Sequence, residues 1–584
     1  MTSAQPPGPT VEMTIDRDVM IPMRDGVRLQ ADVYRPVAHG RYPVLVSRSP
    51  YGRAGGVTGA NYWVPHGYAV LSQDCRGRFG SEGEYYPIVD DGQDGYDTVE
   101  WAAEQPWSNG EIGTIGQSYL AADQHVLAPT RPPHLKAMVP ISASSDFHQS
   151  WVYHTGGALE LGWMVSYAIL KGRNTAERAG LGQKAIEQLD RYLEPADNFG
   201  QPLTDEWYRH LPLSDWSDRL REIAPYFADY LDHPDDGPYW WNINLRRRYH
   251  EVDVPMYHMG SWFDIFQEGA WHNFIGISAL GGERARSTQR LLIGPWAHLF
   301  PYNAPTTGGT GESEFGPEAG VELLEDQRRW FDHWLKGEDS GLMDEPPVKI
   351  FVMGDNRWRQ EHEWPLARTQ FTPYYLHSAG AANGLDGDGA LTPQTPAIEP
   401  ADHFVYDPKD PVPTLGGNTL IIPLGTFNHR ELETRSDVLV YTTEVLSDDL
   451  EVTGPILVTL WAASSAHDTD FTAKLVDVRP DGYVQNVQDG IIRARYRDSA
   501  SEPQLMTPGQ PYRFTIDLWA TSHVFKAGHR LRLEVSSSNF PRFDRNPNTG
   551  RTIATETELA PAAQTVLHDA EHPSHVLLPL IPRA

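Results

Sequence analysis

The segment Ile112-Gly-Thr-Ile-Gly-Gln-Ser118-Tyr-Leu-Ala-Ala122 passes from a short apolar run, through a turn of small residues, into a stretch of helical character. This pattern is typical of a strand–turn–helix elbow that lifts a nucleophilic serine clear of a sheet edge. A serine hydroxyl is a weak nucleophile, so it needs a general base, an acid that orients this base, and donors for the oxyanion. We therefore predict that Ser118 is the nucleophile of a serine hydrolase.

The composition indicates a globular protein with more than one domain. The chain has 584 residues, of which 40% are hydrophobic and 22% are charged, and this length exceeds what one hydrophobic core usually organises. A formal charge of -30 repels phosphate backbones, so nucleic acid is not an expected partner. The single cysteine, Cys75, cannot form an internal disulfide, and no Cys/His cluster has metal-site spacing. We expect no metal and no cofactor.

Targeting signals are not visible in the sequence. Residues 1–10 lack a basic stretch followed by an apolar core, and no apolar run reaches the length of a membrane span. We therefore expect a cytoplasmic protein without a membrane partner. The sequence leaves open whether two copies form a homodimer.

The first 145 residues alternate strand and helix patterns, as a doubly wound sheet requires. Residues 92–105 carry Tyr96, Val99 and Ala103 at helical spacing. The predicted strands are 29–33, 42–47, 68–73 and 135–141. We expect residues 1–145 to form the first part of an α/β-hydrolase domain.

The secondary-structure pattern of the sequence changes twice after residue 145. From 146 to 240 the β runs stop and Trp-, Leu- and charge-rich stretches follow, which predicts an inserted helical cap. Strand patterns at 254–260 and 290–294 then predict that residues 241–350 complete the hydrolase sheet.

The last part of the chain alternates apolar and polar residues at period two. The runs 348–353, 512–518 and 531–535 predict a β jelly-roll domain over residues 351–584. The predicted fold class is therefore α/β, an α/β-hydrolase domain with an inserted helical cap and a C-terminal jelly roll. We expect the β domain to cover one side of the active-site crevice.

Each of the two later hydrolase strands ends in a candidate partner for Ser118. Asp264 ends Gly260-Ser-Trp-Phe-Asp, and His298 ends Gly294-Pro-Trp-Ala-His. The order serine, aspartate, histidine is that of an α/β-hydrolase triad, and the carboxyl ends of parallel strands meet at one edge of a sheet. We predict that His298 is the general base, that Asp264 orients it, and that an acyl-enzyme forms on Ser118.

The oxyanion of this reaction needs at least two donors. The backbone N–H of Tyr119 follows the nucleophile and is placed to give one. The loop Arg48-Ser-Pro-Tyr51-Gly-Arg53 follows the strand 42–47, where this fold usually supplies the second donor. Position alone leaves two interpretations of Tyr51 open: its hydroxyl is an oxyanion donor, or its ring packs in a proline-containing turn.

The chain resembles the cocaine esterase and X-Pro dipeptidyl-peptidase family of serine hydrolases. The resemblance implies a triad at Ser118, Asp264 and His298, and an oxyanion hole made by the Tyr51 hydroxyl and the Tyr119 backbone. It rests on these motifs: Met23-Arg-Asp-Gly-Val-Arg28, Pro50-Tyr51, Asp74-Cys-Arg-Gly77, Ser81-Glu-Gly83, the Ser118 turn, Trp262-Phe-Asp264, Gly294-Pro-Trp296 with His298, and Ser536-Ser-Ser-Asn-Phe-Pro541.

The nucleophile turn departs from the family pattern Gly-x-Ser-Tyr-x-Gly. Ala121 stands at its final position, and Leu120 breaks the general Gly-x-Ser-x-Gly motif. We expect the added methyl group of Ala121 to shift the elbow slightly without removing the site. Phe79 also stands where the family often has glycine.

The residues after Asp264 bear on the substrate. Relatives that act on α-amino esters are known for acidic residues there, whereas this chain has Ile265, Phe266 and Gln267. An uncharged, aromatic surrounding favours a neutral apolar acyl group, because an unpaired ammonium would be costly to bury. The resemblance implies that Trp151 and Phe266 lie where the cocaine esterases line the pocket for a benzoyl group. The alternative for each residue is that it only packs in the core.

We therefore expect a carboxylesterase that acts on small-molecule esters with an aromatic or bulky apolar acyl group. One alternative keeps the chemistry and changes the substrate, as in an X-Pro dipeptidyl peptidase or an α-amino ester or β-lactam side-chain acylase. Another is a non-catalytic binding protein whose β domain carries the function, which the complete set of triad residues disfavours.

Overall fold

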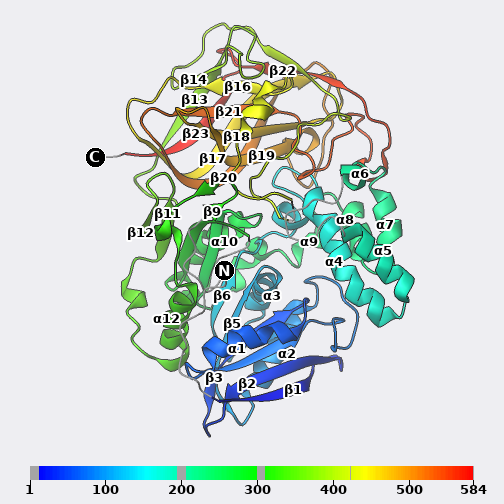
Figure 1. Cartoon of the computed structure of the whole chain (residues 1–584), viewed down its shortest axis with the longest axis vertical. Helices are drawn as coiled ribbons and strands as arrows, with labels where there is room; N and C mark the ends of the chain where they lie inside the picture. Colours follow the sequence, from blue (N-terminus) through cyan, green and yellow to red (C-terminus); the bar gives the residue numbers. More distant parts are fainter. Residues whose placement is uncertain (1–11, 194–204, 299–308, 421, 583–584) are drawn as a thin grey trace.

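The computed structural model describes residues 12–193, 205–298, 309–420 and 422–582. The α/β domain is blue to cyan and green in Figure 1, because the helical insertion (cyan to teal) interrupts it, and the C-terminal β domain is yellow-green to red. The expectation about residues 1–10 lies outside the described residues. Among the described residues, no helix has both the length and the apolar character that a bilayer crossing needs.

The α/β domain is built on a ten-stranded sheet in the order β1-β2-β4-β3-β5-β6-β7-β8-β11-β12. The strands from β4 to β11 run parallel, whereas β1, β2 and β12 pair antiparallel at the two edges. The bounds are β1 Met13–Pro22, β2 Arg28–Pro36, β3 Tyr42–Ser49, β4 Ala69–Asp74, β5 Ser108–Gln117, β6 Leu135–Ile141, β7 Tyr257–Phe263, β8 Arg290–Ala297, β11 Val348–Val352 and β12 Arg357–Glu361.

Helices cover both faces of this sheet, so its central strands are apolar on both sides. In β3, Val44 and Val46 face one core while Leu45 faces the other. Side chains of α1 (Gly56–Trp63) and α12 (Leu323–Lys336) fill the core with Leu45. The opposite core contains residues of α2 (Asp91–Ala103), α3 (Tyr119–Leu127), α10 (Gln267–Leu280) and α11 (Glu283–Arg286). The predicted α/β-hydrolase fold is thus confirmed.

Between β6 and β7 the chain is helical, and these helices lie beside both other parts of the molecule (Figure 1). Trp151, Trp163, Tyr167 and Trp216 are among the many aromatic side chains that fill their core. The helical segments are a π-helical turn His148–Val152, α4 Leu161–Ala179, α5 Gln183–Leu193, α6 Asp205–Tyr208, α7 Ser214–Leu220, α8 Tyr226–Asp232, α9 Pro238–Trp241 and a 3-10 segment Leu245–Glu251.

The C-terminal domain is all β, as the period-two runs predict. Its strands pair in the order β15-β22-β17-β23-β13-β14-β16-β21-β18-β19, and β20 pairs with β17. Their bounds are β13 Gln370–His377, β14 Ala390–Thr392, β15 Asp402–Tyr406, β16 Leu439–Thr442, β17 Leu450–Ser464, β18 Asp470–Val478, β19 Val484–Arg493, β20 Tyr512–Phe525, β21 Arg530–Ser536, β22 Ala562–Leu567 and β23 His575–Ile581.

The run 348–353, expected to open the β domain, belongs to the first sheet. Val348 and Ile350 of β11 pair in parallel with Leu291 and Ile293 of β8, and β12 then closes this edge at Glu361. The hydrolase sheet therefore extends beyond the expected boundary at residue 350. Period-two alternation predicts a strand but not the sheet that it joins.

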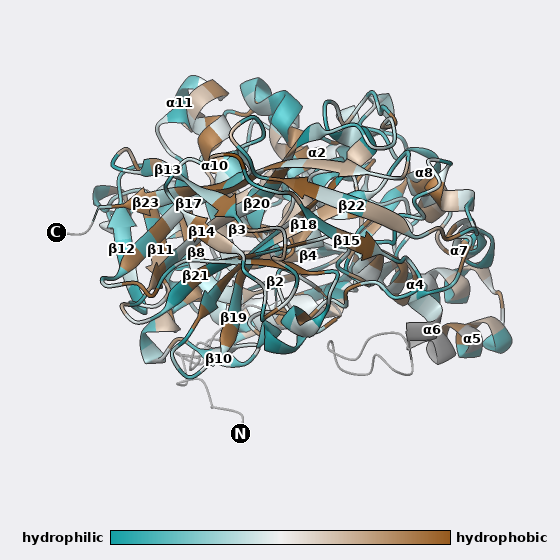
Figure 2. Cartoon of the chain, turned by 90° about the horizontal axis from the view of Figure 1, so that it is seen from above, coloured by the Kyte–Doolittle hydropathy of each residue, from teal (hydrophilic) through white to brown (hydrophobic). Residues whose placement is uncertain are grey.

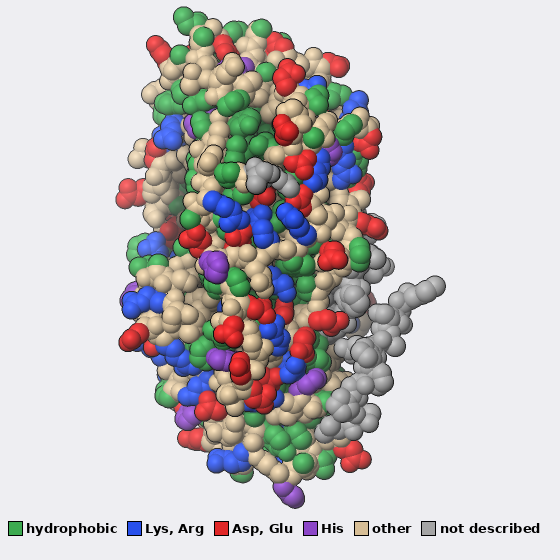
Figure 3. Space-filling model, turned by 90° about the vertical axis from the view of Figure 1, so that its left-hand side faces the viewer, with side chains coloured by type: hydrophobic (Ala, Val, Ile, Leu, Met, Phe, Trp, Pro, Cys, Tyr) green, Lys and Arg blue, Asp and Glu red, His purple; other side chains and the backbone are tan. Residues whose placement is uncertain are grey.

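The distribution of apolar and charged residues fits this layered arrangement. Figure 2 shows hydrophobic segments concentrated among the strands in the interior and hydrophilic ones toward the outline. On the face shown in Figure 3, acidic and basic side chains are both spread over the surface and interspersed.

Candidate active site

Ser118 lies at the sharp turn between β5 and α3. Its backbone has φ 62° and ψ −123°, a conformation that side-chain-bearing residues rarely adopt and that a nucleophile elbow imposes. A Cβ at Gly116 would lie 2.3 Å from the Cβ of Leu120, so the turn needs glycine at that position. Ala121 is fully buried and donates its N–H to the Ser118 carbonyl at 2.9 Å, so the elbow accommodates this alanine.

Asp264 and His298 meet beyond the carboxyl ends of β7 and β8. The Nδ1 atom of His298 lies 3.2 Å from each carboxylate oxygen of Asp264. Asp264 is fully buried and also accepts the backbone N–H of Phe266 at 2.7 Å, which fixes its carboxylate. His298 is 5% exposed, so the pair is largely shielded from water.

The nucleophile turn is tied to the histidine through the residue before the serine. Nε2 of Gln117 donates a hydrogen bond to the backbone carbonyl of His298. Ser118 itself is partly exposed, and a substrate can therefore reach it. The structure thus brings the three predicted triad segments to one edge of the sheet.

The predicted oxyanion phenol also lies at Ser118. Burial raises the pKa of the Tyr51 hydroxyl to about 12, although hydrogen bonding with Tyr167 and Ser118 acts in the opposite direction. The residue as a whole is 43% exposed. A phenol with this pKa keeps its proton at neutral pH and remains a donor.

Tyr119 follows the nucleophile as the first residue of α3, so its backbone N–H has no acceptor within the helix. Its side chain points elsewhere, since the hydroxyl donates to Oδ2 of Asp91 at 2.6 Å. Oδ1 of Asp91 in turn pairs with Nη2 of Arg48 at 2.9 Å, and both charged groups are buried. This buried chain joins the end of β3, just before Tyr51, to the start of α3.

The two predicted acyl-pocket residues are in direct contact. Trp151 stacks on Phe266 with ring centroids 4.6 Å apart and planes 9° apart, and both are buried. The rings of Phe266 and His298 form a T-shaped contact, with centroids 5.3 Å apart and planes 83° apart. Trp163 and Tyr167 of α4 extend this aromatic wall, at 5.4 Å from Phe266 and 6.2 Å from Trp151 respectively. Sequence reasoning assigned neither of them a role.

The β domain supports the backbone that carries Asp264. Nδ2 of Asn418 donates to the carbonyl of Asp264 at 3.0 Å and to that of Trp262 at 2.9 Å. Nε2 of Gln488 donates to the same Trp262 carbonyl at 2.9 Å. No motif marks Asn418 or Gln488 in the sequence, because their role comes from contacts between domains.

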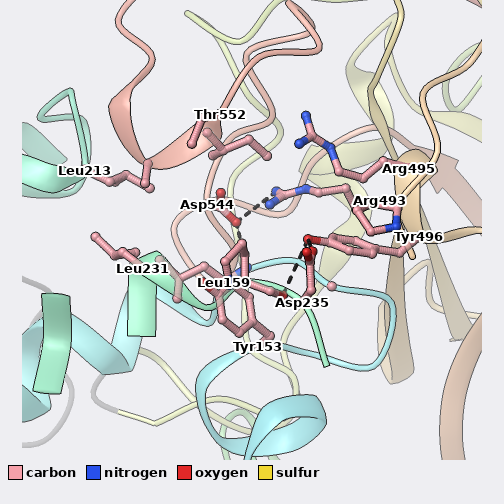
Figure 4. A pocket seen from close by; sticks show the side chains of 15 residues that line it. Tyr153, Leu159, Leu213, Leu231, Asp235, Arg493, Arg495, Tyr496, Asp544 and Thr552 are labelled. Atoms are coloured by element: carbon pink, nitrogen blue, oxygen red, sulfur yellow. Dashed lines mark hydrogen bonds and ion pairs between the residues drawn. The ribbon is translucent and has the colours of Figure 1, made fainter. Parts of the chain in front are cut away.

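A cavity of about 160 Å³ lies between the helical insertion and the β domain (Figure 4). Tyr153, Leu231, Arg493 and Asp544 are among its lining residues, and the predicted triad is not. Arg493 pairs with Asp544 at 2.9 Å, so these charges compensate each other. Among the described residues, no group of three or more His, Cys, Asp or Glu side chains could hold a metal ion.

Comparisons with known proteins identify relatives over nearly the whole chain. Residues 25–300 match the X-Pro dipeptidyl-peptidase (S15 family), and residues 340–577 match the X-Pro dipeptidyl-peptidase C-terminal non-catalytic domain. The chain is 40% identical to the cocaine esterase of Rhodococcus sp. (strain MB1 Bresler), over 98% of this chain and 99% of that protein.

Two solved structures share the fold over nearly their whole length. An aminopeptidase from the marine sediment archaeon Thaumarchaeota archaeon has a TM-score of 0.83 and 25% identity, covering 100% of this chain and 98% of that one. An α-amino acid ester hydrolase has a TM-score of 0.81 and 26% identity, with 99% and 98% covered.

Fold, site and relatives together define a serine hydrolase. More particularly, the chain belongs to the cocaine esterase and X-Pro dipeptidyl-peptidase family.

Proposed function

We propose that this serine esterase cleaves small-molecule esters with an aromatic or bulky apolar acyl group, with Ser118, His298 and Asp264 as its triad. Ser118 Oγ attacks the ester carbonyl and His298 takes its proton, while Asp264 stabilises the imidazolium. The alcohol leaves with the proton from His298, and water then releases the acid by the same steps in reverse order. Tyr51 and the Tyr119 N–H hold the oxyanion.

The observation that carries the acyl preference is the aromatic wall beside His298. Phe266 contacts both the imidazole of His298 and the ring of Trp151, so an aromatic cluster lies directly beside the proposed general base. An aromatic acyl group gains ring contacts there that acetate cannot make.

The nearest acidic residue after Asp264 supports the same preference. Glu268 is fully buried, pairs with Nη2 of Arg246, and accepts hydrogen bonds from Ser145 and Ser150. Its charge is already compensated, so it offers little to a substrate ammonium group.

A panel of p-nitrophenyl esters tests the proposal. We expect kcat/KM for the benzoate to exceed that for the acetate, and Phe266→Leu to lower the benzoate value selectively. Phe371→Leu, at an exposed phenylalanine of β13, is the matched control and should leave the ratio unchanged. Equal benzoate-to-acetate ratios in wild type and Phe266→Leu would refute the acyl assignment.

The second candidate is hydrolysis of α-amino esters or of peptides with a free amino terminus. This candidate is supported by the similarity of the fold to that of an α-amino acid ester hydrolase and of an aminopeptidase. A phenylglycine ester and an X-Pro-p-nitroanilide in the same panel distinguish it. Faster turnover of these than of the benzoate would replace the first candidate.

A further inference from the structure

A buried lysine lies on the ring of the predicted oxyanion phenol. Lys171 belongs to α4 and is 3% exposed, and its Nζ lies 3.2 Å from the centroid of the Tyr51 ring. The ring of Tyr167 is the next aromatic neighbour, at 5.1 Å. Lysine side chains normally extend to bring the ammonium into water, so a lysine held in this place needs a reason.

No carboxylate compensates this amine in the described part of the chain. Burial lowers the pKa of Lys171 well below its ordinary value. Arg78 lowers this pKa further by charge repulsion, and Cys75 acts in the opposite direction. The negative face of the Tyr51 ring is therefore its principal stabilising contact.

A second contact fixes the two residues relative to each other. Arg78 is 2% exposed, and its Nε donates to the carbonyl of Pro50, directly before Tyr51, at 3.0 Å. Its Nη1 donates to the carbonyl of Lys171, also at 3.0 Å. One buried guanidinium thus joins the Tyr51 loop to α4, so the stacking of Lys171 on Tyr51 is built into the fold.

We propose that Lys171 is a positioning residue for Tyr51: it holds the phenol toward Ser118 and strengthens the hydrogen bond that the hydroxyl donates to the negatively charged substrate oxygen. This inference rests on the oxyanion role of Tyr51 in the proposed function. When Ser118 Oγ bonds to the carbonyl carbon, the π electron pair moves to oxygen, and Tyr51 donates a hydrogen bond to that oxygen. Lys171 transfers no proton in this step.

The charge of Lys171 matters more in the transition state than in the resting enzyme. An uncompensated buried ammonium is costly at rest, whereas a nearby oxyanion offsets this cost when it forms. Only an interaction that strengthens on the way to the transition state accelerates the reaction. We therefore expect Lys171 to act on kcat and not on KM.

A double-mutant cycle tests whether Lys171 acts through the Tyr51 hydroxyl. Lys171→Met should lower kcat for p-nitrophenyl acetate about tenfold, with little change in KM, and Lys171→Arg should restore most of the loss. Tyr51→Phe keeps the ring and removes the hydroxyl, so adding Lys171→Met to it should cost less than twofold. Lys184→Met, at an exposed lysine of α5, is the matched control.

Folding and titration separate this role from a structural one. Replacing an unpaired buried amine by a methyl-terminated chain should leave the Tm unchanged or raise it. The facing groups are Tyr51, Tyr167, Arg78 and Cys75. The amine is charged only below its pKa, so the ratio of kcat in the wild type to kcat in Lys171→Met should fall toward one as pH rises. Titration of His298 affects kcat of both proteins alike and therefore does not change this ratio.

The outcomes distinguish this inference from the proposed function. A wild-type enzyme that cleaves no ester, or a Ser118→Ala variant that keeps full activity, would overturn the proposed function. An active wild type with equal kcat in Lys171→Met would overturn the inference alone. So would the same tenfold loss in the wild-type and Tyr51→Phe backgrounds, because Lys171 would then act independently of the hydroxyl.

Discussion

The Nδ1 atom of His298 lies 3.2 Å from both carboxylate oxygens of Asp264, a residue with no solvent exposure. A buried carboxylate that faces Nδ1 favours the tautomer with its proton on Nδ1. Nε2 is then left as a proton acceptor. This is the state that a general base for Ser118 needs.

Asp264→Asn should lower kcat by about 10⁴-fold, the loss seen when the same change is made in a Ser-His-Asp triad, because the amide favours the wrong imidazole tautomer. Steady-state hydrolysis of p-nitrophenyl acetate measures it, and the Tm reports whether the variant is folded. A folded variant with more than a tenth of wild-type kcat would show that Asp264 does not orient the base.

Tyr51→Phe should lower kcat by about 10²–10³-fold, the effect of removing one oxyanion donor. The ring remains, so packing against Lys171 is kept and the Tm should change little. Steady-state kinetics with the same ester gives the answer. A loss below threefold would favour the packing interpretation of this residue.

Tyr119→Phe should lower stability and leave kcat nearly unchanged, because the predicted oxyanion donor at this position is the backbone N–H and not the hydroxyl. The change removes the hydroxyl that donates to Asp91 at 2.6 Å and accepts from the Ile88 N–H at 2.9 Å. We expect the free energy of unfolding to fall by about 1–3 kcal/mol while kcat stays within fivefold. Denaturant unfolding and kinetics together check this, and a loss as large as that of Tyr51→Phe would assign the oxyanion role to the wrong atom.

Asn418→Ala should lower kcat by about tenfold, because it removes the hydrogen bond from the β domain to the Asp264 carbonyl. Asn486→Ala is the matched control: it removes a buried amide whose hydrogen bonds, among the described residues, join it to Gly425 and Phe427 within the β domain. Both substitutions should lower the free energy of unfolding by about 1–3 kcal/mol, but only Asn418→Ala should change kcat. Equal kcat in the two variants would show that the β domain does not position the triad.

The sequence predicted the fold where local patterns decide it. The strand 135–141 has the predicted bounds, and the three predicted triad residues lie at strand ends, since strand, turn and helix signals are local. Sheet membership is not local, so the pattern of residues 348–353 could not show that this strand pairs with β8 in the first sheet. The elbow tolerates Ala121 because the close approach occurs at Gly116 instead.

The site residues that the sequence did not predict are positioned by contacts between distant segments. Lys171 and Asn418 lie in no motif, and their positions beside Tyr51 and Asp264 depend on how α4 and the β domain pack on the sheet. The direct stacking of Trp151 on Phe266 is likewise a product of tertiary packing. In the sequence, the composition of residues 265–267 and the family resemblance at Trp151 and Phe266 indicated an apolar surrounding, but not this contact.

The most direct test of the central claim is peptide mass spectrometry after reaction with a fluorophosphonate. We predict one phosphonyl adduct per chain, on Ser118, with loss of esterase activity in proportion to labelling. Ser118→Ala should take up no adduct and hydrolyse no ester. Labelling of a different serine, or undiminished hydrolysis by Ser118→Ala, would contradict the account.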